Sequence, residues 1–194
     1  IVMEYLDGET LTGTLSREGR LDVPRALHMA RQVCKSLAEA HAVGIVHRDL
    51  KADNIFICEV YGEKDFVKVL DFGIAKILDQ EVTEQASSSG NARSWGSPLY
   101  MSPEQVLNSP VDLRSDLYSL GCILYQMLTG RPPFTAEKAI DVVMAHVEKA
   151  PEPFVEVAPE AAGVPQQIED LVMRMLAKEP HDRPQTAEQV LELI

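Results

Sequence analysis

The chain has 194 residues, of which 45% are hydrophobic and 25% are charged, and its formal net charge is −12. This length favours one domain, and the composition is that of an ordinary core-forming protein. The acidic balance argues against general binding to nucleic acid or to anionic lipid through bulk charge. No apolar run reaches the roughly eighteen residues that a membrane-spanning helix needs. We therefore expect no nucleic-acid partner and no membrane span in this chain.

The cysteines and the first residues bear on cellular location. Cys34, Cys58 and Cys122 lie among apolar residues without the spacing of metal ligands. Such an odd, sparse set favours a reducing, cytoplasmic compartment and ordinary core packing of each thiol. The chain opens on "IVMEYLDG" without an initiator Met, as if a strand were already in progress. We expect an excerpt from a longer parent protein, whose cytoplasmic part could be anchored to a membrane elsewhere.

The first half of the chain is expected to start with a short β-rich segment and to continue as helix. Asp22 suits the N-cap of a helix that runs to about residue 43. Two strands are predicted at residues 55–58 and 66–70, and Gly62 between them suits the turn of a hairpin.

The second half is predicted to be mainly helical after a long polar loop over residues 79–97. A strongly apolar helix over residues 115–129 has the pattern of a buried central helix. The Pro-rich stretch 151–165 is predicted to be a loop between helices. The other predicted helices are 136–149, 166–177 and 186–194.

Polar side chains with metal-binding and proton-accepting chemistry flank the predicted hairpin. Asp49 and Asn54 precede its first strand, Asp71 follows its second, and a hairpin brings these ends together. Amide and carboxylate oxygens suit Mg²⁺, and a further carboxylate can accept a proton. With the cation of Lys51, this set meets the needs of phosphoryl transfer. Residue types and spacing alone leave a second interpretation open, in which these side chains only cap and turn a loop.

Several ordered motifs resemble those of eukaryotic-like protein kinases. "HRDLKADN" (47–54), "DFG" (71–73) and "SPE" (102–104) resemble the catalytic loop, the metal loop and the APE-type motif. "DLRSDLYSLGCILYQMLTGRPPF" (112–134) resembles the central helix, and "DRP" (182–184) resembles the late arginine motif.

The resemblance covers essentially the whole chain and implies a mainly α fold. That fold is the helical C-terminal lobe of a protein kinase, with a short β-hairpin at the active site and the small lobe almost entirely absent. Residues 1–194 would then form a partial kinase domain. Residues 1–11 would be the last small-lobe strand and the hinge, and residues 12–194 the C-terminal lobe.

The resemblance also assigns the chemistry residue by residue. Asp49 would accept or orient the proton of the substrate hydroxyl, and Lys51 would contact the γ-phosphate of ATP. Asn54 and Asp71 would ligate Mg²⁺, or Mn²⁺ in its place.

Other residues are implied to be scaffold. His47 and Phe72 would stack in an internal apolar spine. Glu104 would form a buried salt bridge with Arg183, and Asp116 would hold the backbone of the catalytic loop from the central helix.

The first residues resemble the hinge that binds adenine. Met3 would be the gatekeeper beside the adenine pocket. A solvated surface role stays open for Asp7 and Glu9, and a strand-core role stays open for Phe56. The further nucleotide contacts would be the backbones of Glu4 and Leu6, the ribose partners Asp7 or Glu9, and Phe56 beneath the adenine.

The motif "GSPLYMSPE" resembles the Ser/Thr substrate-docking loop, with Gly96 and with Ser97 where Thr is usual. Together with Lys51, it implies a kinase for Ser/Thr, most similar to bacterial members. Arg48, just before Asp49, implies regulation by phosphorylation of the loop between DFG and SPE. The candidate phosphosites are Ser87, Ser88, Ser89 and Ser94.

The implied function is transfer of the ATP γ-phosphate to Ser or Thr of a protein substrate. The family's glycine-rich loop, third-strand Lys and helix C Glu would precede residue 1, so the parent would be active and residues 1–194 alone inactive. The main alternative is a non-catalytic kinase-like scaffold, which typically lacks one of the four chemical residues present here. A small-molecule phosphotransferase, the weakest alternative, would not need the docking loop.

Overall fold

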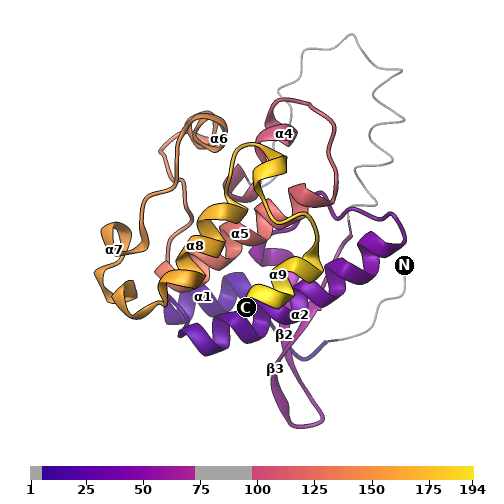
Figure 1. Cartoon of the computed structure of the whole chain (residues 1–194). Helices are drawn as coiled ribbons and strands as arrows, with labels where there is room; N and C mark the ends of the chain where they lie inside the picture. The colour runs from indigo at the N-terminus through magenta and orange to yellow at the C-terminus, as the bar shows by residue number, and fades with distance from the viewer. Residues whose placement is uncertain (1–5, 73–97) are drawn as a thin grey trace.

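In the computed structural model, the parts of the chain that are described are residues 6–72 and 98–194. They form a mainly helical body with a small antiparallel sheet at its lower edge (Figure 1). Within these two ranges no helix has both the length and the apolarity to cross a membrane. The helices are α1 (Leu11–Glu18), α2 (Val23–Ala42), α4 (Pro103–Val106), α5 (Leu113–Thr129), α6 (Ala139–Glu148), α7 (Phe154–Val157), α8 (Gln166–Met175) and α9 (Ala187–Leu193). The strands are β1 (Gly8–Thr10), β2 (Ile55–Val60) and β3 (Glu63–Val69), and 3₁₀ turns are η1 (Ala52–Asn54), η2 (Pro98–Tyr100), η3 (Pro159–Gly163) and η4 (Pro180–Asp182).

Helix α5 lies at the centre of the body, and almost all of its residues are buried (Figure 1). Asp112 caps its N-terminus by accepting from the Arg114 N–H, and Gly130 ends it with a left-handed φ of 78°. Gly121 allows α8 to approach closely, because a Cβ there would lie 2.9 Å from the Cβ of Met175. The predicted buried central helix is therefore confirmed.

Helix α2 packs against α5 on one side and against β3 and α9 on others. The Asp22 side chain accepts from the Arg25 N–H and caps the helix, as its sequence predicts. Buried residues recur with a helical period and form the stripe that faces the core. They are Ala26, Met29, Ala30, Val33, Cys34 and Leu37.

The sheet has the order β1-β2-β3, with both pairs antiparallel. The predicted hairpin is confirmed, and Gly62 at its turn has a φ of 83°. Ile55 pairs with Val69, and one residue further out the Leu70 N–H donates to the Asn54 carbonyl at 2.8 Å. The two segments that carry Asn54 and Asp71 therefore leave the sheet side by side.

One expectation about local structure was wrong. The segment 151–165 contains α7 and η3 rather than only a loop. The reason is tertiary: Phe154 is buried against Tyr125, with ring centroids 5.1 Å apart, and its N–H donates to Glu169 Oε1 at 2.8 Å.

The described part of the front begins with strand β1 at Gly8–Thr10, as expected of a short β-rich segment. Helix α1, which was not predicted, follows directly and is capped by the Thr10 side chain.

The three cysteines are free and buried, which confirms the prediction that they pack in the core. Burial raises the pKa of the Cys34 thiol to about 12, so this thiol stays protonated at neutral pH.

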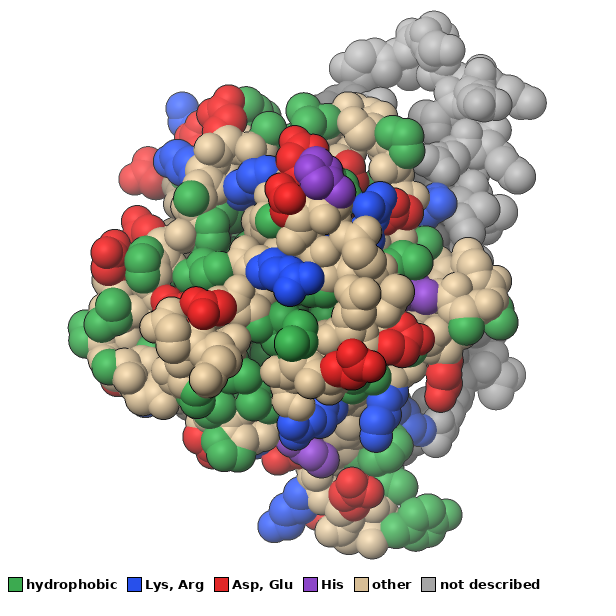
Figure 2. Space-filling model, in the orientation of Figure 1, with side chains coloured by type: hydrophobic (Ala, Val, Ile, Leu, Met, Phe, Trp, Pro, Cys, Tyr) green, Lys and Arg blue, Asp and Glu red, His purple; other side chains and the backbone are tan. Residues whose placement is uncertain are grey.

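Acidic and basic side chains are interspersed on the face of the molecule shown in Figure 2. Lys and Arg side chains lie there singly or in small groups between carboxylates. Neither sign of charge forms a continuous field on the described part of this face.

His146 on α6 is the centre of a buried polar cluster beside α5. Its Nδ1 lies 2.9 Å from the hydroxyl oxygen of Tyr118, and its ring packs edge-on against Phe134. The Lys178 amine lies 4.4 Å from the centroid of the same Phe134 ring. Burial, reinforced by the charge of Lys178, lowers the pKa of His146 to about 4. His146 is therefore uncharged in the folded protein at neutral pH.

This burial predicts a specific loss of stability in acid. Because the folded-state pKa of His146 lies below its ordinary 6.5, the unfolded chain binds an extra proton between about pH 6.5 and 4. The free energy of unfolding should thus fall by about 1–2 kcal/mol between pH 7.5 and 5 through this residue alone. His146→Gln should remove that part of the fall in urea unfolding curves. His181→Gln, at a side chain that is 72% exposed, is the matched control. Equal pH dependence in all three proteins would contradict the assignment.

Candidate active site

The backbone of the loop before β2 is held by one buried carboxylate on α5. Asp116 accepts the His47 N–H at 2.8 Å and the Arg48 N–H at 2.9 Å, one on each oxygen. His41 Nε2, at the end of α2, lies 2.8 Å from the same group. Arg48 has a left-handed φ of 64°, which a non-glycine residue keeps only when its surroundings enforce it. Asp116 supplies much of that enforcement.

The His47 ring joins this loop to the segment after β3. Its Nδ1 lies 3.3 Å from the Asp49 backbone nitrogen, and its Nε2 lies 3.0 Å from the Leu70 carbonyl oxygen. Since a backbone N–H can only donate, Nδ1 accepts and Nε2 donates. The ring also packs at 4.8 Å from the Phe72 ring, tilted by 46°. The two ends of the hairpin are therefore tied together by one side chain.

Asp49 and Lys51 form an ion pair at the mouth of the hairpin. The Lys51 amine lies 2.9 Å from Asp49 Oδ2, and the two side chains are 24% and 30% exposed, respectively. A carboxylate and a cation are thus adjacent and reachable from solvent. This pair can bring a proton acceptor and a positive charge to the same reacting group.

Asn54 and Asp71 supply oxygen atoms that suit a hard cation. The Asn54 Nδ2 donates to the Asp49 carbonyl at 3.0 Å, so this amide turns its oxygen, not its nitrogen, to other partners. Asp71 is exposed and has a left-handed φ of 53°. One amide oxygen and one carboxylate fit Mg²⁺, which commonly binds few protein ligands together with phosphate oxygens. Among the described residues, no three His, Cys, Asp or Glu side chains gather into a metal cluster of their own.

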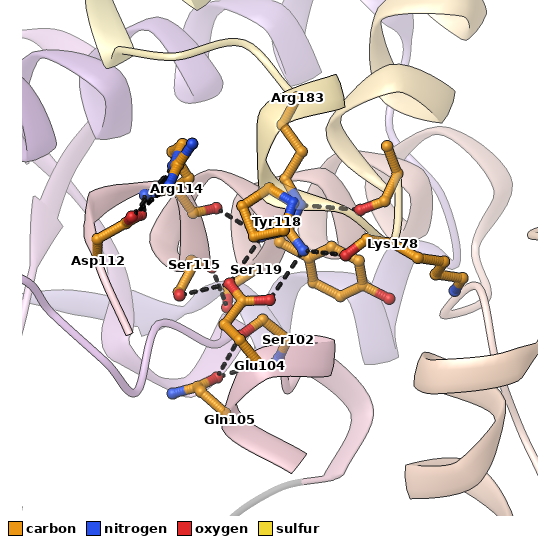
Figure 3. A network of polar contacts seen from close by, with 12 residues as sticks. Ser102, Glu104, Gln105, Asp112, Arg114, Ser115, Tyr118, Ser119, Lys178 and Arg183 are labelled. Atoms are coloured by element: carbon orange, nitrogen blue, oxygen red, sulfur yellow. Dashed lines mark hydrogen bonds and ion pairs between the residues drawn. The ribbon is translucent and has the colours of Figure 1, made fainter. Parts of the chain in front are cut away.

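A buried ion pair fixes the segment that begins the second described range. Glu104 on α4 lies between Ser102 and Gln105 on one side and Arg183 on the other (Figure 3). The Arg183 guanidinium donates to its two carboxylate oxygens at 2.7 and 2.8 Å, and Ser115 Oγ donates at 2.5 Å.

Arg183 is 1% exposed and also donates to the carbonyls of Ala177, Lys178 and Arg114. Burial alone would raise the pKa of Glu104, but the hydrogen bonds from Arg183 and Ser115 outweigh it and hold that pKa below its usual value. This pair is therefore charged, fully hydrogen-bonded and structural.

Gln105 is a contact residue that the sequence reasoning missed. Its Oε1 accepts from the Ser102 backbone N–H at 3.0 Å and from Ser102 Oγ at 3.2 Å. Its Nε2 donates to the Arg48 carbonyl at 2.6 Å. The spacing of Ser102 and Gln105 is that of a capping box, which could have been read from the sequence. The contact to Arg48, 57 residues away, could not.

The predicted nucleotide-binding residues are only partly described. Leu6 is half-buried and Asp7 is exposed. Glu9 accepts from Thr14 Oγ1 at 3.0 Å and is ion-paired with Arg17, so its carboxylate takes part in a local network. Phe56 is half-buried in β2, opposite Thr10 and Lys68. The predicted site residues outside the described ranges are Met3, Glu4, Ser87, Ser88, Ser89, Ser94, Gly96 and Ser97.

Residues 1–193 match the family described as protein kinase domain. The chain belongs to the protein kinase family. It is 44% identical over 189 residues to the serine/threonine-protein kinase pkn3 of Myxococcus xanthus, covering 97% of this chain and 34% of that protein. It is 41% identical over 192 residues to the serine/threonine-protein kinase PknB of Mycobacterium tuberculosis, covering 96% of this chain and 28% of that protein. A third relative, the serine/threonine-protein kinase Pkn1 of Myxococcus xanthus, is 44% identical over 183 residues, which is 94% of this chain and 25% of that protein.

These findings confirm the resemblance to bacterial Ser/Thr kinases and the mainly helical kinase-lobe fold. The kinase chain spans between a quarter and about a third of the length of these relatives. The segment held by Asp116 is the one that resembles the family's catalytic loop, and the segment tied to His47 resembles its metal loop.

Breaking the buried Glu104–Arg183 pair should lower the free energy of unfolding far more than breaking an exposed ion pair of the same chain. Glu104→Gln should lower the free energy of unfolding by about 3–5 kcal/mol, because it leaves the guanidinium buried without a counter-charge. Arg17→Gln breaks ion pairs of a side chain that is 59% exposed, and should cost less than about 1 kcal/mol. Chemical denaturation of both variants measures the difference. Similar losses in the two variants would show that Glu104 does not act as a buried charge.

Proposed function

We propose that the full-length protein is a Ser/Thr protein kinase and that its phosphoryl-transfer residues are Asp49, Lys51, Asn54 and Asp71. The observation that carries this proposal is the geometry of one loop. Lys51 lies 2.9 Å from the Asp49 carboxylate, while the Asn54 amide donates to the Asp49 carbonyl at 3.0 Å. A proton acceptor, a cation and a metal ligand are therefore fixed relative to one another before any substrate binds.

In this mechanism each side chain has one task. Asp49 accepts a hydrogen bond from the substrate hydroxyl, orients its oxygen toward the γ-phosphate and takes up its proton. Lys51 places its charge beside the transferred phosphoryl group. Asn54 and Asp71 hold Mg²⁺, or Mn²⁺ in its place, which when bound neutralises charge on the phosphates of ATP. The His47 and Asp116 contacts keep the loop in position throughout.

The substrate class is proposed to be Ser or Thr of a protein. It is supported by Lys51 in the loop, by the names of the relatives and by the motif that contains Gly96 and Ser97. Regulation is proposed through a phosphate that pairs with Arg48. The candidate sites for that phosphate are Ser87, Ser88, Ser89 and Ser94.

The nucleotide is proposed to be ATP, held along a hinge formed by residues 1–11. Residues 12–194 are proposed to be the C-terminal lobe. No G-x-G-x-x-G motif occurs in the 194 residues, so activity is proposed for the full-length protein and not for these residues alone. The hinge contacts would be Met3, Glu4, Leu6 and Asp7, and Phe56 would lie beneath the adenine. Because Glu9 is already engaged with Arg17, Asp7 is the better ribose partner.

The compartment is proposed to be the cytoplasm, where ATP and Mg²⁺ are available. The alternative of a non-catalytic kinase-like scaffold is disfavoured because all four phosphoryl-transfer residues are present.

Asp49→Asn in the full-length protein should lower the rate of phosphate transfer by about 10²–10⁴-fold, because the amide cannot accept the proton. The measurement is transfer of labelled phosphate from ATP to a generic basic protein, followed by phosphoamino acid analysis for Ser and Thr. Asp170→Asn removes a carboxylate from the exposed surface of α8 and should keep wild-type activity. Wild-type activity in Asp49→Asn would refute the assignment, and phosphate found only on Tyr would refute the substrate class.

A further inference from the structure

The peptide group that joins Arg48 to Asp49 is held at both ends. Its carbonyl oxygen accepts from Gln105 Nε2 at 2.6 Å, and its N–H lies 3.3 Å from His47 Nδ1. The preceding N–H, that of Arg48, is held by Asp116. Since a peptide group is planar, fixing its two ends fixes its plane and the direction of the bond to the Asp49 Cα, from which the side chain departs. Of the three side chains that hold this backbone, that of His47 lies in the loop, that of Asp116 in α5 and that of Gln105 in α4.

The Gln105 amide can make this contact in one orientation only. Its oxygen faces two donors of Ser102, the backbone N–H and the hydroxyl. Turning the amide over would place its NH₂ against the Ser102 N–H and its oxygen against the Arg48 carbonyl, so both contacts would become repulsive. Ser102 is fully buried and therefore a rigid support. Figure 3 shows this support directly beside Glu104, the partner of Arg183.

We propose that Gln105 is a positioning residue for phosphoryl transfer. Through the Arg48 carbonyl it keeps the left-handed backbone of Arg48 and thereby aims the Asp49 carboxylate. Because Gln105 lies on α4, the direction of the Asp49 carboxylate also depends on the position of that helix. A movement of the SPE segment would therefore change the backbone at Arg48 and Asp49. This proposal rests on the proposed kinase function for its kinetic consequence, but not for the contact itself.

The competing role for Gln105 is that of a helix cap alone. Gln105→Glu separates the two roles, because a carboxylate still accepts from Ser102 but cannot donate to the Arg48 carbonyl. The matched control is Gln189→Glu. Gln189 also uses its Oε1 to accept a backbone N–H, that of Gln185 at 2.7 Å, at the start of α9. It is exposed and receives the same change in charge.

In the full-length protein, Gln105→Glu should lower kcat by about 10- to 100-fold and change the KM for ATP by less than about threefold, because misaimed chemistry does not weaken nucleotide binding. Gln189→Glu should match the wild type in both constants. A fall that appears only in KM, or a wild-type kcat in Gln105→Glu, would overturn the positioning role.

Amide hydrogen exchange of the same proteins tests the contact without relying on activity. In Gln105→Glu, peptides that contain residues 47–49 should exchange about tenfold faster, while peptides from α4 should exchange as in the wild type. Faster exchange in α4 would assign Gln105 to capping and overturn the proposal, as would unchanged exchange at 47–49. If the wild type transfers no phosphate, the proposed function fails, and exchange still decides whether the clamp exists. If Gln105→Glu does not fold, Gln105→Ala, which adds no charge, is judged by the same criteria at residues 47–49.

Discussion

The arrangement of the candidate active site depends on the contacts of the Asp116 carboxylate. This carboxylate is buried in the first turn of α5, yet it receives hydrogen bonds from the backbones of His47 and Arg48 and lies against His41. A buried carboxylate is costly unless its oxygens are satisfied, and here both oxygens are. The hydrogen bonds that stabilise this carboxylate form only in one conformation of the loop that contains His47 and Arg48. Any other path of the loop would take both backbone donors away from this buried carboxylate and leave only His41 beside it.

Helix α5 therefore serves as a polar scaffold inside an apolar core. Ser115 donates to Glu104, and Ser119 Oγ donates to the Tyr100 carbonyl at 2.7 Å, so successive turns of one helix hold successive segments of the chain. Residues on the same face of a helix lie one turn apart, which sets the spacing of the segments they hold. Together with Asp116, these side chains place the catalytic loop and the SPE segment on a common rigid element.

The sequence predicted the parts of the fold that follow from local pattern. The hairpin, the capped helix at Asp22 and the buried helix α5 were found from turn residues, caps and periodicity. Prediction from the sequence failed where contacts between residues far apart in the chain decide the structure. Helix α1, which contains Gly13, was not predicted, and α7 forms because Phe154 packs on the core. The chemistry at Asp49 was predicted from motifs, but its support by Gln105 required coordinates, since a hydrogen bond to a backbone carbonyl leaves no trace in the acceptor's residue type.

The packing of α9 on α2 has a consequence for how the chain is made. The apolar stripe of α2 is complete after residue 37, whereas the helix that covers part of it, Ala187–Leu193, is synthesised about 150 residues later. During that interval the α2 stripe lacks part of its final cover. Long-range closure of this kind slows folding and leaves apolar surface open to other chains. The growing polypeptide is therefore open to misassociation along α2 until α9 has emerged from the ribosome.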